Sequence, residues 1–262
     1  MKLLFSKFHG AGNDFILIDN RGGLFLPEKE FVARLCDRHF GVGADGLILL
    51  HHREGFDFDM RYFNSDGNES TMCGNGGRCV TAFASRLGII GTTARFAAID
   101  GVHQAEILAG EGDDFLIRVQ LRDTMVEASG PTGTFINTGS PHLVRFVAET
   151  AKVDVVREGR RIRNSKRFAE EGVNVDFVEV GRDALHVRTY ERGVEDETLS
   201  CGTGVTAAAL VTASKFPDNK GYYNILTRGG SMKVRFTQNR NRFTDIWLEG
   251  PVRSVFEGEV AR

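Results

Sequence analysis

Residues 73–79 read Cys-Gly-Asn-Gly-Gly-Arg-Cys, and residues 201–204 read Cys-Gly-Thr-Gly. Each stretch places a cysteine at a glycine-rich turn. Each turn is followed by a segment with apolar residues at helical spacing, residues 80–88 and 205–211. Two thiols at two equivalent helix starts indicate one site to which both halves of the chain contribute.

A single offset relates these two stretches and the segments around them. Cys201 follows Cys73 by 128 residues. The same shift aligns further pairs: Gly12 with Ser140, Tyr62 with Tyr190, Glu69 with Glu197, and Gly101 with Gly229. Copies of about 120 residues have the size of ordinary domains and are far longer than the roughly 20–50 residues of a solenoid repeat. The chain is therefore predicted to contain two homologous lobes.

The repeat predicts an α+β fold of two pseudo-symmetric lobes, with the active site in the cleft between them. Each lobe is expected to wrap a mostly antiparallel sheet or barrel around one central hydrophobic helix, because residues 205–211 are apolar nearly all round. We place the N-terminal lobe at residues 1–125, joined by the C-terminal segment 251–262, and the C-terminal lobe at residues 126–250. A linker is predicted near residues 127–133, where glycine and proline cluster.

The composition narrows the class of protein. The chain of 262 residues is 41% hydrophobic and 26% charged, as in soluble globular proteins. A net charge of -2 gives no electrostatic footprint for nucleic acid or for an anionic membrane. No apolar run approaches the roughly 18–20 residues of a membrane-spanning helix, and the first residues are too polar for a signal peptide. We therefore expect a cytoplasmic location, where thiols stay reduced.

The spacing of the four cysteines does not match a metal site. Cys36 and Cys79 are expected to be structural, with Cys79 packed inward. Asp45 and Asp66 are predicted to stabilise turns rather than to act as acids. The basic run at residues 157–167 is predicted to be an exposed loop or edge.

Cysteines at helix starts are suited to acid–base chemistry. A helix N-terminus stabilises a thiolate by up to about 2 kcal/mol in a partly buried site, which lowers a thiol pKa by about 1.5 units. The N–H groups of Gly74, Asn75, Gly202 and Thr203 would lie at those starts and suit a carboxylate. One thiolate would remove a proton from a carbon next to that carboxylate, and the other thiol would deliver a proton to the opposite face. Such a site inverts a stereocentre without pyridoxal or a metal.

These motifs resemble those of the diaminopimelate epimerase family. The resemblance rests on Phe-His-Gly-Ala-Gly-Asn-Asp-Phe at residues 8–15, Asn-x-Asp-Gly at 64–67, Tyr-Glu-Arg-Gly at 190–193 and the two cysteine motifs, and it covers essentially the whole chain. It implies the family's fold and a cofactor-independent, two-base interconversion of LL- and meso-diaminopimelate, a step in lysine and peptidoglycan synthesis. It also implies a small-molecule substrate and a possible homodimer.

The resemblance also implies roles for single residues. Cys73 and Cys201 would be the acid and base, with His142 and Glu191 assisting catalysis. The substrate-binding residues would be Asn13, Gly46, Asn64, Gly74, Asn75, Ser140, Asn174, Glu191, Arg192, Gly202 and Thr203. Arg192 would clamp the distal carboxylate and Glu191 would pair with an ammonium. Two positions depart from the family pattern, because many members have Asn at Ser140 and Gln at Gly46.

Two other readings remain open. A related cofactor-independent racemase of the same fold would act on proline, hydroxyproline or histidine, but its pocket need not carry the Glu191–Arg192 pair. A ligand-binding or redox protein would instead join the two thiols in a disulfide. A substrate panel separates the diaminopimelate epimerase from the racemase. The effect of reductant on turnover tests the redox reading.

Overall fold

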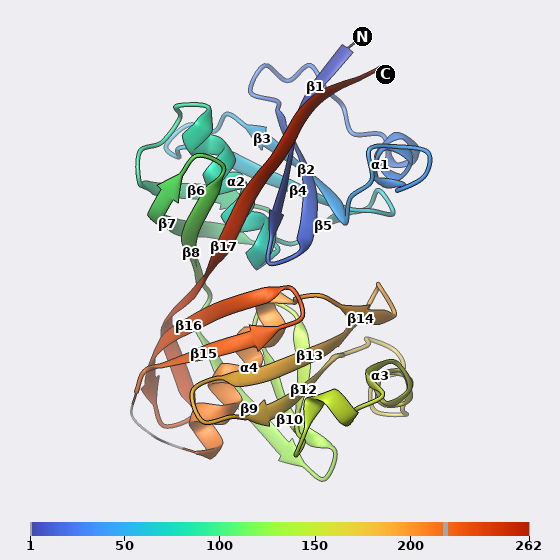
Figure 1. Cartoon of the computed structure of the whole chain (residues 1–262), viewed down its shortest axis with the longest axis vertical. Helices are drawn as coiled ribbons and strands as arrows, with labels where there is room; N and C mark the ends of the chain where they lie inside the picture. The colour runs from blue at the N-terminus through green and yellow to red at the C-terminus, as the bar shows by residue number, and fades with distance from the viewer. Residues whose placement is uncertain (1, 217–219, 262) are drawn as a thin grey trace. The chain divides into compact units, whose positions relative to one another are not determined.

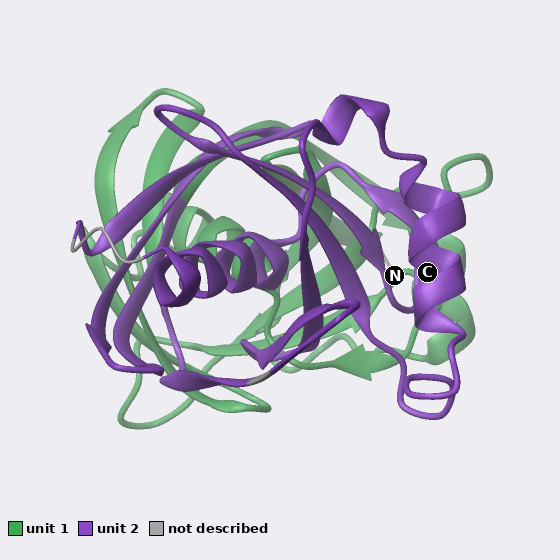
Figure 2. Cartoon of the chain, turned by 90° about the horizontal axis from the view of Figure 1, so that it is seen from below, with its two compact units in different colours: residues 1–119, 250–262 green, residues 120–249 purple. Residues whose placement is uncertain are grey.

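The computed structural model describes residues 2–216 and 220–261, and it divides into two compact units. Unit 1 comprises Met1–Val119 with Gly250–Arg262, and unit 2 comprises Gln120–Glu249 (Figure 2). No helix in the described part of the chain combines the length and apolar character that crossing a bilayer requires.

Unit 1 is a closed ring of eight strands with one helix packed against them. Its elements in chain order are β1 (Lys2–Gly10), β2 (Asn13–Asp19), α1 (Lys29–Cys36), β3 (Gly46–His51), β4 (Asp59–Asn64), β5 (Glu69–Ser70), α2 (Gly74–Arg86), β6 (Thr93–Ala98), β7 (Gly101–Glu111) and β8 (Asp114–Leu121). The last strand of the chain, β17 (Arg242–Ala261), completes the ring, which runs β17–β1–β2–β3–β4–β6–β7–β8 and closes through the pairing of β8 with β17. Among the pairs of this ring whose register is described, only β2–β3 and β4–β6 are parallel.

Unit 2 repeats this plan. Its elements are β9 (Thr124–Gly130), β10 (Gly133–Asn137), β11 (Pro141–Phe146), η1 (Thr150–Lys152), α3 (Val155–Arg163), β12 (Asn174–Val180), β13 (Leu185–Glu191), β14 (Asp196–Thr198), α4 (Gly202–Lys215), β15 (Tyr222–Thr227), β16 (Gly230–Asn239) and β17 (Arg242–Ala261). Its ring runs β9–β10–β11–β12–β13–β15–β16–β17 and closes through β17–β9.

Helices α2 and α4 are the central helices of the two units. Helix α4 contacts seven of the eight strands of its ring and is buried nearly all round, from Gly202 to Ala213 (Figure 2). Helix α2 contacts β1, β2, β3 and β7 and buries every residue of Gly74–Ala84 (Figure 1). The predicted architecture of two like lobes, each with a mostly antiparallel barrel around a hydrophobic helix, is confirmed.

The outer helices α1 and α3 pack on the strand residues that alternate with those facing the central helices. On β3, Leu47 and Leu49 join the cluster that also buries Leu35 of α1, whereas Ile48 points to the opposite face, near α2. The same arrangement recurs where Val175 and Phe177 of β12 pack with Val155 and Ile162 of α3. Each sheet is therefore apolar on both faces, as strands covered on both sides should be.

The offset of 128 residues holds for every element of the repeat. Shifting β2, α2 and β7 by this offset places them on β11, α4 and β16. The long strand β17 corresponds to β8 and β9 joined end to end. Its residues up to Glu249 serve the ring of unit 2, and those from Gly250 serve the ring of unit 1.

Two sequence expectations are wrong. Residues 127–133 are not a linker, because they form the hairpin of β9 and β10 inside unit 2. Glycine and proline mark that hairpin turn as readily as they mark a linker. Much of the basic run lies in helix α3 rather than in a loop, since Val155, Gly159 and Ile162 bury one face and Asp154 caps its start by accepting the Arg157 N–H at 3.1 Å.

Candidate active site

Each predicted catalytic cysteine is the residue at which a central helix begins. Cys73 has an extended backbone (φ −89°, ψ 130°) directly before α2, and Cys201 (φ −116°, ψ 113°) directly before α4. Their carbonyl oxygens accept the first helical hydrogen bonds, from Gly77 at 2.7 Å and Val205 at 2.9 Å. Neither thiol caps its helix. Both sulfurs therefore lie beside N–H groups that have no partner within the helix.

Glycines at the helix starts make room for strand side chains. A Cβ on Gly204 would lie 2.5 Å from Asp176 Oδ1, and one on Gly76 would lie 3.1 Å from Ile48 Cδ1. Glycine inside a helix costs about 1 kcal/mol relative to alanine. The close approach that it permits places a buried carboxylate of β12 against the first turn of α4.

A chain of polar side chains connects Cys201 to that carboxylate. Cys201 Sγ lies 3.5 Å from Thr203 Oγ1, Thr203 Oγ1 lies 2.9 Å from His142 Nε2, and His142 Nδ1 lies 2.8 Å from Asp176 Oδ2. His142 and Asp176 are fully buried, on the adjacent parallel strands β11 and β12. Thr189 Oγ1 donates to Asp176 Oδ1 at 2.8 Å and fixes the carboxylate from its other side.

The partners of His142 determine its tautomer. A carboxylate only accepts hydrogen bonds, so Nδ1 carries the proton that it donates to Asp176. In the neutral ring, Nε2 is then an acceptor for the hydroxyl of Thr203. Asn174 Nδ2, 3.3 Å from Nε2, is a second donor to that nitrogen. The arrangement makes Nε2 of the neutral ring a hydrogen-bond acceptor that is joined to Cys201 through one hydroxyl.

Of the hydrogen-bonded residues that extend from Cys201, Asp176 is the one that the sequence analysis missed. The repeat offset aligns it with Ile48, so the first copy carries no counterpart. One signal was present, because Asn174 and Asp176 occupy alternate positions of a strand whose other residues, apart from Glu179 near its end, are apolar. Two polar side chains on the inward face of a buried strand indicate a site.

Burial dominates the pKa of Cys201. Removal from water raises the pKa of this thiol well above its ordinary value, and the negative charges of Glu191 and Asp176 raise it further. The Thr203 hydroxyl and the Gly204 N–H oppose that shift without cancelling it. The expectation that this helix start lowers the thiol pKa is therefore wrong for Cys201, because desolvation outweighs the hydrogen bonds from Thr203 and Gly204.

Two further predicted residues adjoin this chain. Asn174 Oδ1 accepts the backbone N–H of Arg192 at 2.8 Å, which links the end of β13 to the residue beside His142. Glu191, the last residue of β13, acts electrostatically on Cys201. The exposed Arg192 guanidinium donates to the carbonyl of Glu171 at 2.7 Å.

Cys73 is half-buried and lies among amides instead of an imidazole. Its Sγ lies 3.6 Å from Asn13 Oδ1, which also accepts Asn75 Nδ2 at 3.2 Å. The fully buried Arg78 donates to Asn75 Oδ1 at 2.8 Å. Asn13 Nδ2 donates to Asp45 Oδ2 at 2.6 Å.

An ion cluster lies behind those amides. Asp14 pairs with Lys7 and Arg38, each at 2.7 Å, and Arg38 also reaches Asp45 at 2.8 Å. Burial raises the pKa of Asp14, but hydrogen bonds from Arg38 and Lys7 outweigh it and hold that pKa at about 2. Asp45 thus does more than stabilise a turn, whereas Asp66 caps the Asn68 N–H at 2.9 Å as predicted.

The remaining predicted residues lie at strand ends. Gly46 and Asn64 are cross-strand partners at the start of β3 and the end of β4. A Cβ on Gly46 would lie 2.5 Å from Phe63 O and 2.6 Å from Tyr62 Cε2, so this chain has no room for a side chain there. Ser140 is half-buried in the turn before β11, and its carbonyl accepts the Thr138 N–H at 3.2 Å.

Cys36 and Cys79 have structural settings. Both are buried, and burial raises the pKa of Cys36 to about 12 and that of Cys79 still higher. The prediction that Cys79 packs inward is confirmed.

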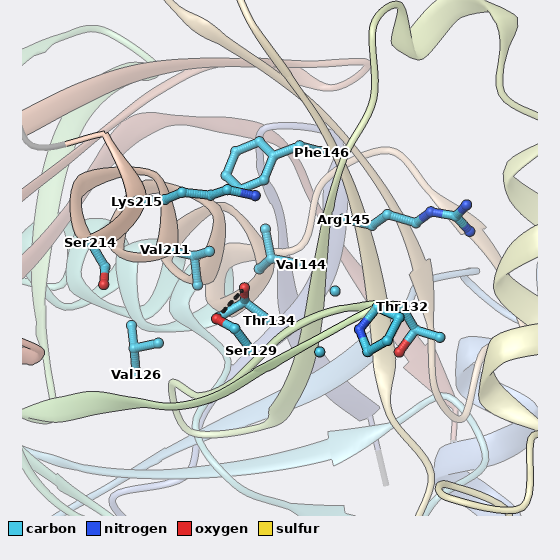
Figure 3. Close-up of a pocket in the computed structure, with 13 residues that line it drawn as sticks. Val126, Ser129, Thr132, Thr134, Val144, Arg145, Phe146, Val211, Ser214 and Lys215 are labelled. Atoms are coloured by element: carbon cyan, nitrogen blue, oxygen red, sulfur yellow. Dashed lines mark hydrogen bonds between the residues drawn. The ribbon is translucent and has the colours of Figure 1, made fainter.

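A cavity of about 470 Å³ lies elsewhere in unit 2 (Figure 3). It is lined at the last turns of α4 by Val211, Ser214 and Lys215, and on the strands by Ser129 and Thr134 among others. Val211 follows Cys201 by ten residues, about 15 Å along the helix axis. This cavity includes none of the predicted site residues, so it is separate from the cysteine chemistry.

Comparison with known proteins finds relatives that match this sequence over nearly its whole length. The model of the family described as diaminopimelate epimerase matches residues 5–120 and 134–255. The diaminopimelate epimerase of Flavobacterium psychrophilum is 47% identical over 253 residues, covering 96% of this chain and 97% of that protein. The diaminopimelate epimerase of Aquifex aeolicus is 42% identical over 277 residues, covering 98% and 97%.

Solved structures share the fold at low identity. A phenazine biosynthesis protein of the PhzF family from Bacillus anthracis superposes with a TM-score of 0.75 at 16% identity and covers 100% of both chains. A probable proline racemase from Agrobacterium radiobacter with bound carbonate superposes with a TM-score of 0.75 at 15% identity, covering 99% of this chain and 93% of that one. At such identities, these likenesses show the fold alone.

Proposed function

Because this chain belongs to the diaminopimelate epimerase family and is an isomerase, we propose that it interconverts LL- and meso-diaminopimelate by a cofactor-independent, two-base mechanism. Cys73 and Cys201 are the two bases. The observation that carries the proposal is the chain from Cys201 through Thr203 and His142 to Asp176, which gives a buried thiol a route for its proton.

The reaction is a proton exchange at one carbon. One thiolate takes the α-proton, and the electron pair of the broken C–H bond is delocalised into the substrate carboxylate. The other thiol then gives its proton to the opposite face of that carbon and becomes the thiolate. The first-turn N–H groups of α2 and α4, including those of Gly74, Asn75, Gly202 and Thr203, would stabilise the charge on the carboxylate.

The hydrogen bonds from Cys201 through Thr203 to His142 allow this thiol to lose its proton despite its raised pKa. Its S–H donates to Thr203 Oγ1, the Thr203 hydroxyl donates to His142 Nε2, and proton transfer along this line yields a thiolate and an imidazolium. Asp176 stabilises that imidazolium from the Nδ1 side. A thiol that burial keeps protonated thus becomes a base without contact with bulk water.

Glu191 links substrate binding to this chemistry. Its negative charge raises the pKa of Cys201 in the free protein. An ammonium group of the substrate placed against Glu191 would neutralise that charge, so the pKa of Cys201 would fall when the substrate binds. Arg192, the next residue in the sequence, would hold the distal carboxylate of the substrate.

The other polar groups would orient the substrate. Asn13, Asn64, Ser140 and Asn174 each offer an amide or hydroxyl, and Gly46 offers backbone alone. The rival reading, a racemase for proline, hydroxyproline or histidine, does not require the Glu191–Arg192 pair.

We also expect a cytoplasmic homodimer. Leu4, Val255 and Phe256 are exposed on the paired strands β1 and β17, so unit 1 offers apolar surface to a second copy. Light scattering during size-exclusion chromatography tests this, and a monomer at micromolar concentration would exclude it.

Chiral chromatography after incubation with each amino acid tests the function. We expect turnover of LL- and meso-diaminopimelate and none of proline, hydroxyproline or histidine. Cys73→Ala and Cys201→Ala should each lose at least about a thousandfold in kcat, while the matched control Cys36→Ala should retain activity because that thiol is buried in the core. Normal turnover by both active-site variants would exclude the mechanism.

A further inference from the structure

A one-directional chain of hydrogen bonds lies beside Cys73. Arg78 Nη2 donates to Asn75 Oδ1 at 2.8 Å, Asn75 Nδ2 donates to Asn13 Oδ1 at 3.2 Å, and Asn13 Nδ2 donates to Asp45 Oδ2 at 2.6 Å. A guanidinium stands at the donor end of this chain and a carboxylate at its acceptor end. Cys73 Sγ adjoins it at Asn13 Oδ1, 3.6 Å away.

The charged ends fix the orientation of both amides. An asparagine amide is nearly symmetric in shape, so only its partners decide which side carries the oxygen. A guanidinium only donates and a carboxylate only accepts. Turning the Asn13 amide around would set its oxygen against the Asp45 carboxylate. Turning the Asn75 amide around would set its NH2 against the Arg78 cation.

The orientation of Asn13 affects the state of Cys73. Asn13 presents an oxygen to the sulfur, and an oxygen accepts from S–H but repels S⁻. A hydrogen bond that only the neutral form makes favours the neutral form. The arrangement therefore favours a protonated Cys73 in the free protein.

We propose that Asp45 and Arg78 are positioning residues that, through Asn13 and Asn75, keep an acceptor oxygen against Cys73 and so hold this thiol as the proton donor of the resting enzyme. The inference deepens the proposed function and rests on it. Neither residue touches the reacting atoms, because each acts through an amide.

Asp45 is itself held in place. Its Oδ1 accepts Arg38 Nη2 at 2.8 Å, and its Oδ2 also accepts the Asp14 N–H at 3.1 Å. Arg38 is anchored in turn by two hydrogen bonds to Asp14, at 2.7 and 3.1 Å. The carboxylate therefore has one oxygen committed to the ion cluster and the other aimed at Asn13.

The fold does not require this chain of hydrogen bonds, because unit 2, the second copy of the repeat, lacks it. The offset of 128 residues places Val173 opposite Asp45, Thr206 opposite Arg78 and Pro141 opposite Asn13. Thr206 Oγ1 donates to the Gly202 carbonyl at 2.9 Å within its own helix. The same backbone is built with apolar and hydroxyl residues in unit 2, so the charges in unit 1 serve something other than folding.

Asp45→Ala is the sharpest variant. It removes the carboxylate that accepts from Asn13 Nδ2, so no acceptor fixes the Asn13 amide from that side. The amide can then turn its NH2 toward Cys73, where it stabilises a thiolate. Asp14→Asn is the matched control, because it removes one negative charge from the ion cluster but keeps the backbone N–H that Asp45 Oδ2 accepts and a side-chain oxygen that can accept from Arg38. Arg78→Lys keeps a cationic donor, and Arg78→Met removes it.

Iodoacetamide labelling across a pH series reads out Cys73 directly. Trypsin releases residues 62–78 as a peptide whose only cysteine is Cys73, so mass spectrometry follows this thiol alone. We expect Asp45→Ala to label at a pH lower by roughly one unit, a tenfold change in thiolate fraction. Its kcat for diaminopimelate should fall about ten- to hundredfold with little change in KM. Asp14→Asn and Arg78→Lys should stay within about twofold of wild type in both measurements.

The outcomes separate the proposals. An unchanged labelling pH in Asp45→Ala overturns the role of the amide chain, as does an equal shift in Asp14→Asn. If Asp45→Ala does not fold, the pair Arg78→Lys and Arg78→Met decides, with a shift expected only in the second. The tryptic peptide of Arg78→Met covers residues 62–86 and includes Cys79, so fragment ions must assign its label to Cys73. Labelling needs no substrate. A wild type that does not epimerise diaminopimelate therefore refutes the proposed function while leaving the labelling result to judge the amide chain.

Discussion

The two helix starts share a backbone and differ in what surrounds the sulfur. Cys201 is buried and joined through Thr203 to a histidine that can take up a proton. Cys73 is half-buried and faces Asn13, an amide whose orientation is set by permanent charges. A duplicated fold therefore supplies two equivalent positions, and in the proposed mechanism the side chains around them decide which thiol accepts a proton and which thiol gives one.

The largest effect should come from the imidazole. His142 aligns with Asp14 under the repeat offset, so the two can be compared directly. His142→Gln removes the proton acceptor of Cys201 and should lower kcat by about 10²- to 10⁴-fold, whereas Asp14→Asn should change it within about twofold. Steady-state kinetics in both directions measures this. Equal losses in the two variants would mean that the halves are not specialised as described.

A smaller loss is expected from Asp176→Asn. The new amide can still contact His142 Nδ1, but it neither enforces the tautomer nor stabilises an imidazolium. We expect kcat to fall about ten- to hundredfold with KM nearly unchanged, and a steeper dependence of rate on pH. Thr189→Val, which removes only the hydroxyl donor to Asp176, is the graded control and should lose less than tenfold. A larger loss in that variant than in Asp176→Asn would contradict the order of roles.

Glu191→Gln separates binding from electrostatics. Removing this negative charge should lower the pKa of Cys201 in the free protein, because Glu191 raises it. The variant should therefore form its Cys201 thiolate at lower pH, yet bind substrate worse and show a KM raised about tenfold or more. Ultraviolet titration of the thiolate, with Cys73→Ala as background, measures the first effect. A thiolate that forms at higher pH would show that the sign is wrong.

The smallest effect concerns stability in acid and belongs to the Cys73 half. The pKa of Asp14 is about 2 in the folded protein, below the value of about 3.9 in an unfolded chain. The unfolded state therefore binds the proton more tightly. The contribution of Asp14, at most about 2 kcal/mol, is complete above pH 4 and lost as pH falls toward 2. Urea unfolding of wild type and Asp14→Asn at pH 6 and pH 3 tests this, and a difference that grows at the lower pH would contradict it.

How far the sequence leads also differs between the halves. The 128-residue offset was sufficient to predict two lobes, their central helices and both cysteines, because periodicity and glycine-rich turns are local signals. The Asp176 carboxylate was missed, since only the pairing of β11 with β12 brings it to His142. The raised pKa of Cys201 was missed as well, because burial is a property of the assembled barrel.

The Cys73 half shows a different limit. Asn13 and Asn75 were assigned by resemblance to a family, but Asp45 was expected only to stabilise a turn. Its contact with Asn13 spans 32 residues of sequence, and no spacing rule reports such a pair. Residues 127–133 show that a local signal can also mislead, since the same glycines and proline suit a hairpin and a linker.

The central claim is that two thiols on two helices exchange one proton with a single carbon. Incubating LL-diaminopimelate with the enzyme in heavy water and following both isomers by mass spectrometry at low conversion tests it most directly. The account predicts one solvent deuterium on each inverted α-carbon and none in the unreacted isomer, because the base that removes the proton is not the acid that returns one. Product that retains the original proton, or early deuterium in the starting isomer, would show that a single base serves both faces.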